Sequence, residues 1–169
     1  EAGSTRRMGK IMMILAWTAG LSLAAMWFSG VEERRFNPNQ QPESVTTEGG
    51  VEVRLESNPQ GHYLVRGAIN GRDVTFLLDT GATFVAIPAN VADSLGLPRG
   101  RRVMVNTANG TAASFTTRID SLRLGAISLQ DVDAGIVPGM GGDEILLGMS
   151  ALRQLEFSQR GGELILRQH

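Results

Sequence analysis

The sequence predicts a small all-β domain, and three observations support this fold class. Apolar and polar residues alternate with a period of two in VEVRLE, residues 51–56. Asn70-Gly71 and Asn109-Gly110 lie between apolar runs, where Asn-Gly pairs favour hairpin turns. Beyond residue 50, only Ala89–Leu95 and Met149–Leu155 have a helical pattern. Many short strands with so little helix indicate an all-β barrel or sandwich with one short C-terminal helix.

The remaining strands are predicted from the same signals, apolar runs bounded by turn residues. HYLVRGAIN (62–70) and RDVTFLLD (72–79) are apolar-rich runs joined by the Asn70-Gly71 turn. Further strands are predicted at Arg102–Thr107, Ala113–Leu124, Ile127–Val137, Leu155–Ser158 and Glu163–Arg167. We find no convincing internal repeat. A fold that needs two matching halves must therefore obtain the second half from another molecule.

An uncharged N-terminal run, Ile11–Val31, predicts a transmembrane helix. It is long enough to cross a bilayer, which takes about 20 residues. A cleaved signal peptide is the alternative, although SLAAM is only a poor version of a cleavage site. Three basic residues precede the run and two follow it, so the positive-inside rule narrowly favours a cytoplasmic N-terminus. We expect a single-pass membrane protein with its folded domain on the periplasmic side.

The chain therefore divides into four expected parts. Its lack of an initiating Met is consistent with first residues that were introduced by cloning. Residues 32–50 are polar, with Pro38, Pro42 and a glycine pair, which is typical of a flexible linker. The expected parts are an N-terminal segment (1–10), a transmembrane helix (11–31), the linker (32–50) and a folded domain (51–169).

Composition excludes several classes of function. The 169 residues carry a formal net charge of −1, and the basic residues form no stripe, so no nucleic-acid partner is expected. Cysteine is absent, and only two histidines occur, which excludes Cys-ligated metals and H-E-x-x-H zinc sites. We expect His62 to be structural or exposed, because no G-x-S-x-G motif accompanies it. Neither a metal nor another cofactor is predicted.

One carboxylate stands out from the others in FLLDTGATF, residues 76–84. An acid flanked so closely by apolar side chains is costly unless a function requires it there. Gly81 permits a tight turn after Asp79, and Ala82 keeps the path of the chain uncrowded. An ordinary turn at the end of a strand is the competing interpretation. We take Asp79 as the candidate catalytic residue.

Three motifs resemble those of the retropepsin-like aspartic proteases. LLDTGAT (77–83) is similar to their active-site loop, and ILLGMSAL (145–152) resembles their second signature. VNTANGT (105–111) lies where the family places its flap hairpin. The motifs occur in the family's order over roughly residues 51–167 and look most like the bacterial DTGA-type branch, whose members often carry an N-terminal membrane segment.

The resemblance implies a small closed β-barrel of the retropepsin type that acts as a homodimer, with Asp79 from each chain. The implied activity is that of a membrane-tethered aspartic endopeptidase, in which the aspartate pair activates a water that hydrolyses the peptide bond. Besides the second copy, the expected partners are a peptide or protein substrate and the membrane. Thr80, Gly81 and Ala82 would support the active-site loop, and Thr107, Ala108, Asn109 and Gly110 would form the flap over the substrate.

The motifs depart from the family in one respect. Retroviral members commonly place an acid shortly after D-T-G-A and an Arg after the glycine of the second signature, and this pair braces the dimer. Here these positions are Thr83 and Met149, so an apolar contact is expected in place of the ion pair. The missing charges favour an alternative function, a non-catalytic peptide-binding or assembly module with the same fold.

Overall fold

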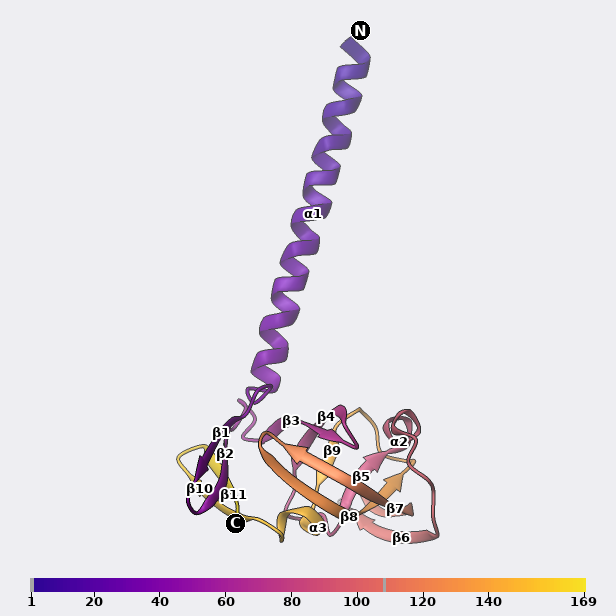
Figure 1. Cartoon of the computed structure of the whole chain (residues 1–169). Coiled ribbons are helices and arrows are strands. Elements are labelled where there is room, and N and C mark those ends of the chain that lie inside the picture. The colour runs from indigo at the N-terminus through magenta and orange to yellow at the C-terminus, as the bar shows by residue number, and fades with distance from the viewer. Residues whose placement is uncertain (1, 108) are drawn as a thin grey trace. The chain divides into compact units, whose positions relative to one another are not determined.

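The computed structural model describes residues 2–107 and 109–169, which form two compact units that meet in sequence at Phe36 and Asn37. The first unit is one helix, and the second is mostly β (Figure 1). The elements are α1 (Ala2–Phe36), β1 (Glu43–Thr47), β2 (Gly50–Glu56), β3 (Leu64–Ile69), β4 (Arg72–Leu78), β5 (Val85–Pro88), α2 (Ala89–Leu95), β6 (Arg102–Thr107), β7 (Gly110–Leu124), β8 (Ile127–Val137), β9 (Ile145–Leu147), α3 (Met149–Leu152), β10 (Glu156–Arg160) and β11 (Glu163–Gln168).

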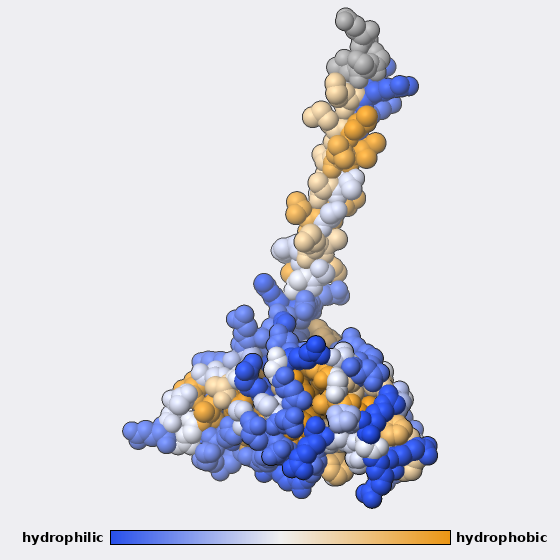
Figure 2. Space-filling view, turned by 45° about the vertical axis from the view of Figure 1, so that its right-hand side comes forward, coloured by the Kyte–Doolittle hydropathy of each residue, from blue (hydrophilic) through white to orange (hydrophobic). Residues whose placement is uncertain are grey.

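The helix α1 is apolar over its middle and charged near both ends (Figure 2). Within the described residues, its part from Arg6 to Phe36 is the one helix long and apolar enough to cross a membrane. The hydroxyls of Thr18 and Ser29 donate to the carbonyls of Ile14 and Met26 one turn earlier, so both are satisfied without water. Length and composition fit a membrane span and also a signal sequence.

Two sheets make up the unit Asn37–His169. The smaller one has the strand order β1-β2-β11-β10, and every pair in it is antiparallel. The larger one has the order β3-β4-β9-β5-β8-β7-β6, with β3 also paired to β7. Figure 1 shows the two groups of strands in different parts of this unit. An all-β fold with one short helix near the C-terminus is confirmed.

The barrel is not fully closed, which corrects one detail of the prediction. The larger sheet folds back on itself, but β3 and β7 are joined by only two residue pairs, Ala68↔Arg123 and Ile69↔Leu122. The strands β1, β2, β10 and β11 stand outside this ring in their own sheet. The two ends of the chain within this unit therefore form a separate layer instead of joining the barrel.

The predicted Asn-Gly turn connects β3 to β4 and also helps to join β3 to β7. Asn70 and Gly71 both have positive φ angles, of 50° and 79°, as a two-residue type I′ hairpin loop requires. The side-chain oxygen of Asn70 accepts the Ser121 N–H at 3.0 Å, while the Asn70 N–H donates to the Ser121 carbonyl. The same turn residue thus fixes the hairpin register and the position of β7.

The core lies within the unit Asn37–His169 and draws on both sheets. Each large apolar side chain that is buried contributes about 2 kcal/mol to the free energy of unfolding, so this core is the main stabilising element. Its largest side chains that are essentially inaccessible to solvent are Phe76, Leu55, Leu64, Ile69, Ile87, Ile119, Leu122, Leu124, Ile127, Ile136, Ile145 and Leu147. Three of them, Phe76, Ile145 and Leu147, belong to the strands β4 and β9 that lead to the candidate site.

The structure differs from the flexible linker predicted over residues 32–50. The helix α1 continues to Phe36, and β1 pairs with β2 from Glu43↔Arg54 to Thr47↔Gly50. The strand β1 is exposed on both faces, so its sequence ESVTT shows no alternation that periodicity could detect. Backbone pairing with β2, and not apolar burial, therefore orders this segment.

The two short helices lie where helical patterns were predicted, but α3 is shorter. The helix α2 ends at Gly96, whose φ of 67° is the left-handed conformation that glycine adopts at helix ends. The helix α3 ends at Leu152 instead of Leu155. Beyond it, the N–H groups of Gln154 and Leu155 bond to carbonyls three residues earlier, which is the tighter 3₁₀ pattern.

His169 links the two sides of the smaller sheet. Its Nε2 lies 3.0 Å from Oε1 of Glu156 on β10, and its Nδ1 lies 2.9 Å from the carbonyl of Gly49 in the β1–β2 turn. Two acceptors face the two ring nitrogens, so the doubly protonated ring suits this site. The hydrogen bond and charge of Glu156 raise the pKa of His169, and those of His169 lower the pKa of Glu156.

Removing this contact by His169→Gln is expected to destabilise the protein slightly, in a pH-dependent way. The raised pKa means that the histidine's contribution is complete below its ordinary pKa of 6.5 and is lost as the pH rises through the raised value. The lowered pKa of Glu156 means that its share is lost only as the pH falls through that lowered value. Urea unfolding should show a larger difference from wild type at about pH 5.5 than at about pH 8.5. Equal differences at both pH values would contradict this account.

Candidate functional site

Asp79 lies directly after β4, where the parallel strand β9 ends beside it. The two strands pair from Phe76↔Ile145 to Leu78↔Leu147. The Asp79 N–H then donates to the Leu147 carbonyl at 3.2 Å, and the Asp79 carbonyl accepts the Ala82 N–H at 3.2 Å. The backbone of Asp79 is thus held on one side by the end of β9 and on the other by its own turn.

The carboxylate of Asp79 is held by the loop that follows it. The Gly81 N–H donates to Asp79 Oδ1 at 2.9 Å, and a Cβ at position 81 would lie 3.1 Å from this oxygen. Asp79 is half-buried, whereas Thr80 and Gly81 are exposed in the single chain. The loop therefore presents an oriented carboxylate, the Thr80 side chain and an uncrowded backbone at one surface.

The turn at Gly148 supports the loop from behind. The Met149 N–H donates to the Ala82 carbonyl at 2.8 Å, and the Ser150 N–H donates to the Thr83 carbonyl at 2.9 Å. These bonds join the two segments that sequence motifs had singled out separately. The active-site loop and the second signature thus form one hydrogen-bonded unit.

Ser150 completes this unit; it lies within ILLGMSAL, but the motif assigned it no role. Its hydroxyl accepts the Val85 N–H at 3.0 Å and donates to the Asp133 carbonyl at 2.7 Å. Ser150 is 5% exposed and its bond to the Val85 N–H is buried, whereas its bond to the Asp133 carbonyl is partly buried. Ser150 therefore connects α3 to β8 and to the strand β5 that follows the Asp79 loop.

Ser150→Ala is expected to lower the free energy of unfolding by about 1 to 3 kcal/mol, because it leaves the buried Val85 N–H without its partner and removes the bond to the Asp133 carbonyl. Urea denaturation measures this loss. Ser158→Ala on the exposed strand β10 is the matched control and should stay within about 0.5 kcal/mol of wild type. Equal stabilities of the two variants would show that the hydroxyl of Ser150 does not brace the site.

Three of the predicted flap residues, Thr107, Asn109 and Gly110, lie at the tip of the β6–β7 hairpin. Thr107 pairs with Gly110, and the Thr107 hydroxyl donates to the Gly110 carbonyl at 2.7 Å. The same hydroxyl oxygen accepts the Asn109 N–H at 3.2 Å. Ala108 lies outside the described residues. The hairpin is thus present where it was predicted, while its role as a flap stays a prediction.

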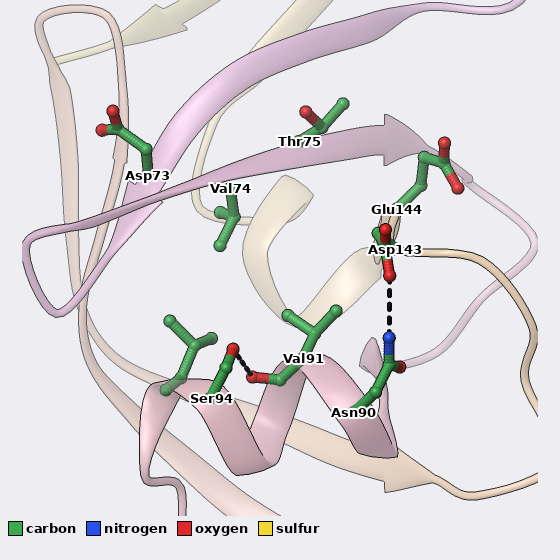
Figure 3. A pocket seen from close by; sticks show the side chains of 9 residues that line it. Asp73, Val74, Thr75, Asn90, Val91, Ser94, Asp143 and Glu144 are labelled. Atoms are coloured by element: carbon green, nitrogen blue, oxygen red, sulfur yellow. Dashed lines mark hydrogen bonds between the residues drawn. The ribbon is translucent and has the colours of Figure 1, made fainter.

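A second surface feature, an open pocket of about 440 Å³, lies between β4 and α2 (Figure 3). Asp73 and Thr75 contribute from β4, and Asn90 donates to Asp143 at 2.7 Å across one end. Asp79 does not line this pocket. Within the residues that the structure describes, no group of three or more His, Cys, Asp or Glu side chains is arranged to hold a metal ion.

A family model described as "gag-polyprotein putative aspartyl protease" matches residues 65–154, which is more than half of the chain. This range contains the Asp79 loop, the β6–β7 hairpin and the Gly148 turn. The chain belongs to this aspartyl protease family. The retropepsin-like resemblance of its motifs is thereby confirmed, while the bacterial DTGA-type branch stays a prediction that is compatible with the match.

The chain is also similar to one solved structure and to one curated protein. A crystal structure of a retropepsin-like aspartic protease from Rickettsia conorii superposes with a TM-score of 0.60 over 77% of this chain and 96% of that one. Because the two share 21% identity, this likeness shows the fold. The "Uncharacterized protein in cobV 5'region" of Sinorhizobium sp is 34% identical over 125 residues, or 72% of this chain. The chain spans about half the length of that curated relative, 54%.

The two positions that lack the charges of retroviral members lie close together. Met149 supplies the donor of one of the two backbone bonds between the loop and the Gly148 turn, and Thr83 supplies the acceptor of the other. Met149 is partly buried and packs against the core of its own chain, and Thr83 is exposed. Backbone hydrogen bonds therefore connect these two segments within one chain.

Proposed function

We propose that this protein is a membrane-tethered aspartic endopeptidase that hydrolyses peptide bonds as a homodimer. The observation that carries the proposal is the Asp79 loop, in which a Gly81 N–H orients a half-buried carboxylate at the surface of the single chain. The sequence holds one D-T-G and no second. A pair of carboxylates therefore requires a second copy that contributes its own Asp79.

The chemistry follows from placing two carboxylates side by side. They cannot both ionise easily, so the pair shares one proton and titrates as a unit. The ionised Asp79 takes a proton from a bound water, while the protonated Asp79 of the second copy hydrogen-bonds the substrate carbonyl. The water then attacks the carbonyl carbon directly, and no acyl-enzyme forms. The C–N bond breaks as the nitrogen takes a proton from the aspartate pair, which releases the amine and the new carboxylic acid.

The neighbouring residues would position the two reactants. Thr80, which is exposed in the single chain, would pair its hydroxyl with the partner loop and hold the two aspartates in place. Gly81 and Ala82 leave room for a close approach of substrate backbone. An extended peptide would bind as an added strand under the hairpin tip formed by Thr107, Ala108, Asn109 and Gly110, which would close over it and exclude water.

The helix α1 would serve as the anchor of this protease. Its apolar run lies exposed along its length, as a lipid-facing helix requires. The distribution of basic residues around it supports a domain on the periplasmic side. Confinement to a membrane raises the effective concentration of the monomers and so favours the dimer.

Cleavage of a diverse peptide mixture tests the activity. The full chain in detergent is incubated with the mixture, with and without a statine-type inhibitor, and the cuts are mapped by mass spectrometry. Specific cuts that the inhibitor removes are the expected result. Their absence at every pH from about 4 to about 8 would overturn the proposal.

Dilution tests the dimer. The unit Asn37–His169, which contains its own core, is expected to lose specific activity as it is diluted toward nanomolar concentration, because the dimer dissociates by mass action. The full chain in lipid vesicles should keep its activity over the same range of bulk concentration. A specific activity of the soluble unit that stays flat down to nanomolar protein would contradict a weak homodimer.

A second candidate function is supported by Thr83 and Met149, which lack the charges that brace retroviral dimers. With a weaker or displaced dimer, the same fold would bind peptides without cleaving them. Peptide binding at about pH 4 to 8 without any cut would favour this peptide-binding or assembly module over the protease.

A further inference from the structure

Asn39, which follows α1 by only three residues, is fully hydrogen-bonded inside the unit Asn37–His169. Its Nδ2 donates to the carbonyls of Glu56 and Leu64, at 2.8 and 2.7 Å, and its Oδ1 accepts the Glu56 N–H at 2.7 Å. Its own carbonyl accepts the Arg66 N–H at 3.1 Å, and its N–H donates to Oδ1 of Asn37 at 2.9 Å. Every polar group of this residue is therefore used.

Burial makes these bonds difficult to break. Asn39 is 5% exposed and Asn37 is 6% exposed, so releasing them would strand backbone groups of β2 and β3 without partners. The next residues are held as well, since Ser44 accepts the Ala126 N–H at 3.0 Å and β1 pairs along its whole length with β2. We call residues Asn37–Thr47 the anchored segment.

The anchored segment shortens the reach of the chain. A free linker over residues 32–50 would extend to about 65 Å by itself. Val31, the last residue of the uncharged run, and Asn39 are eight positions apart, which allows at most about 28 Å. Asn39 pairs with Val65, and Val65 pairs with Phe76, at strand spacings of about 4.8 Å. The three positions from Phe76 to Asp79 add at most about 10 Å.

Chain length therefore limits Asp79 to within about 50 Å of the end of the apolar run, for every arrangement of the two units. We propose that the anchored segment confines the active site to the membrane surface, so that its substrates are extended segments of other membrane-anchored proteins close to the bilayer. The inference rests on the proposed function, because it assumes that α1 is an anchor and that Asp79 cleaves peptides.

Two membrane-anchored substrates test the confinement. Each is a single-pass peptide in phosphatidylcholine vesicles that carries a sequence cut in the peptide mixture. Rigid helical spacers place this sequence about 20 Å or about 80 Å from the bilayer, at about 1.5 Å per residue. The full chain in the same vesicles should cleave the near substrate at least about 10-fold faster than the far one. Insertion of about 40 Gly and Ser residues between Phe36 and Asn37 should raise cleavage of the far substrate at least about fivefold.

Cleavage by the soluble unit Asn37–His169 distinguishes a failure of the confinement from a failure of the proposed function. This unit should cut both substrates at similar rates, because chain length no longer limits it. If the full chain also cuts both equally, the confinement is wrong while the protease stands. If neither protein cuts either substrate, the proposed function falls, and the inference falls with it.

Hydrogen exchange tests the anchored segment without any activity. In the full chain, the amides of Glu56 and Arg66, which bond to Asn39, should be protected. Asn39→Ala should raise the exchange rate of the Glu56 amide at least about 10-fold, whereas Asn106→Ala on the exposed face of β6 should leave it unchanged. Unprotected exchange throughout β1 in the wild-type chain would overturn the proposal.

Discussion

Asp79→Asn is expected to lower kcat for peptide cleavage by at least about 1,000-fold. The amide cannot take a proton from water, and a homodimer made from this variant lacks both carboxylates. Asn keeps an Oδ1 that can accept the Gly81 N–H, so the loop should keep its shape. Steady-state kinetics on a peptide cut by the wild-type protein, with urea unfolding of the same samples, measures both effects.

Asp73→Asn is the matched control for this variant. It removes the same charge from β4, the strand that leads to Asp79, but Asp73 is exposed and forms a surface ion pair with Arg66 at 3.3 Å. Such pairs contribute at most about 1 kcal/mol, so activity should stay within about twofold of wild type. If Asp79→Asn retained more than about a tenth of the activity, Asp79 would not be the catalytic carboxylate.

The predicted fold was most accurate where local patterns decide the structure. The strands β6 and β8 have the predicted bounds, and Asn70-Gly71 forms the predicted hairpin, because alternation and turn geometry are properties of neighbouring residues. Besides β1, two strands were missed for a related reason. β9 has three residues, too few for a period to appear, and β5 ends in Pro88 and pairs mainly in parallel with β8. Their strand character comes from distant partners.

In the candidate site, too, features defined by neighbouring residues could be predicted from the sequence, whereas contacts between distant residues could not. The D-T-G motif located Asp79 and its loop, because residue types and close spacing define that turn. Ser150 was missed, since its hydroxyl bonds to Val85, 65 positions away in sequence. Asn39 was placed in a flexible linker, because a polar composition cannot reveal a residue whose hydrogen bonds are all supplied by β2 and β3.

The segments around positions 83 and 149, which lack the charges of retroviral members, are connected to each other within the chain. Two backbone hydrogen bonds join them, from Met149 to Ala82 and from Ser150 to Thr83. These hydrogen bonds need no particular side chain, but they need the two segments of the chain to approach each other closely. At Gly148, next to Met149, an added Cβ would collide with the backbone of Phe84 and Ala82. The absence of a side chain at Gly148 therefore permits the approach that the two hydrogen bonds require.

Gly148→Ala is accordingly expected to destabilise the protein by about 3 kcal/mol or more and to abolish peptide cleavage. A Cβ at this position would lie 2.2 Å from the Phe84 carbonyl oxygen and 2.8 Å from that of Ala82. Both contacts are backbone atoms, so relief requires the Asp79 loop to move away from α3.

Urea unfolding and kinetics compare this variant with Gly139→Ala, where an added Cβ has no neighbour within 4 Å. Gly139 lies in the connection between β8 and β9 without a positive φ, so alanine there should be neutral or slightly stabilising. Activity should fall in the Gly148 variant even under conditions where it remains folded, because the displaced loop carries the carboxylate. A folded Gly148→Ala protein with wild-type kcat would show that the close approach does not position Asp79.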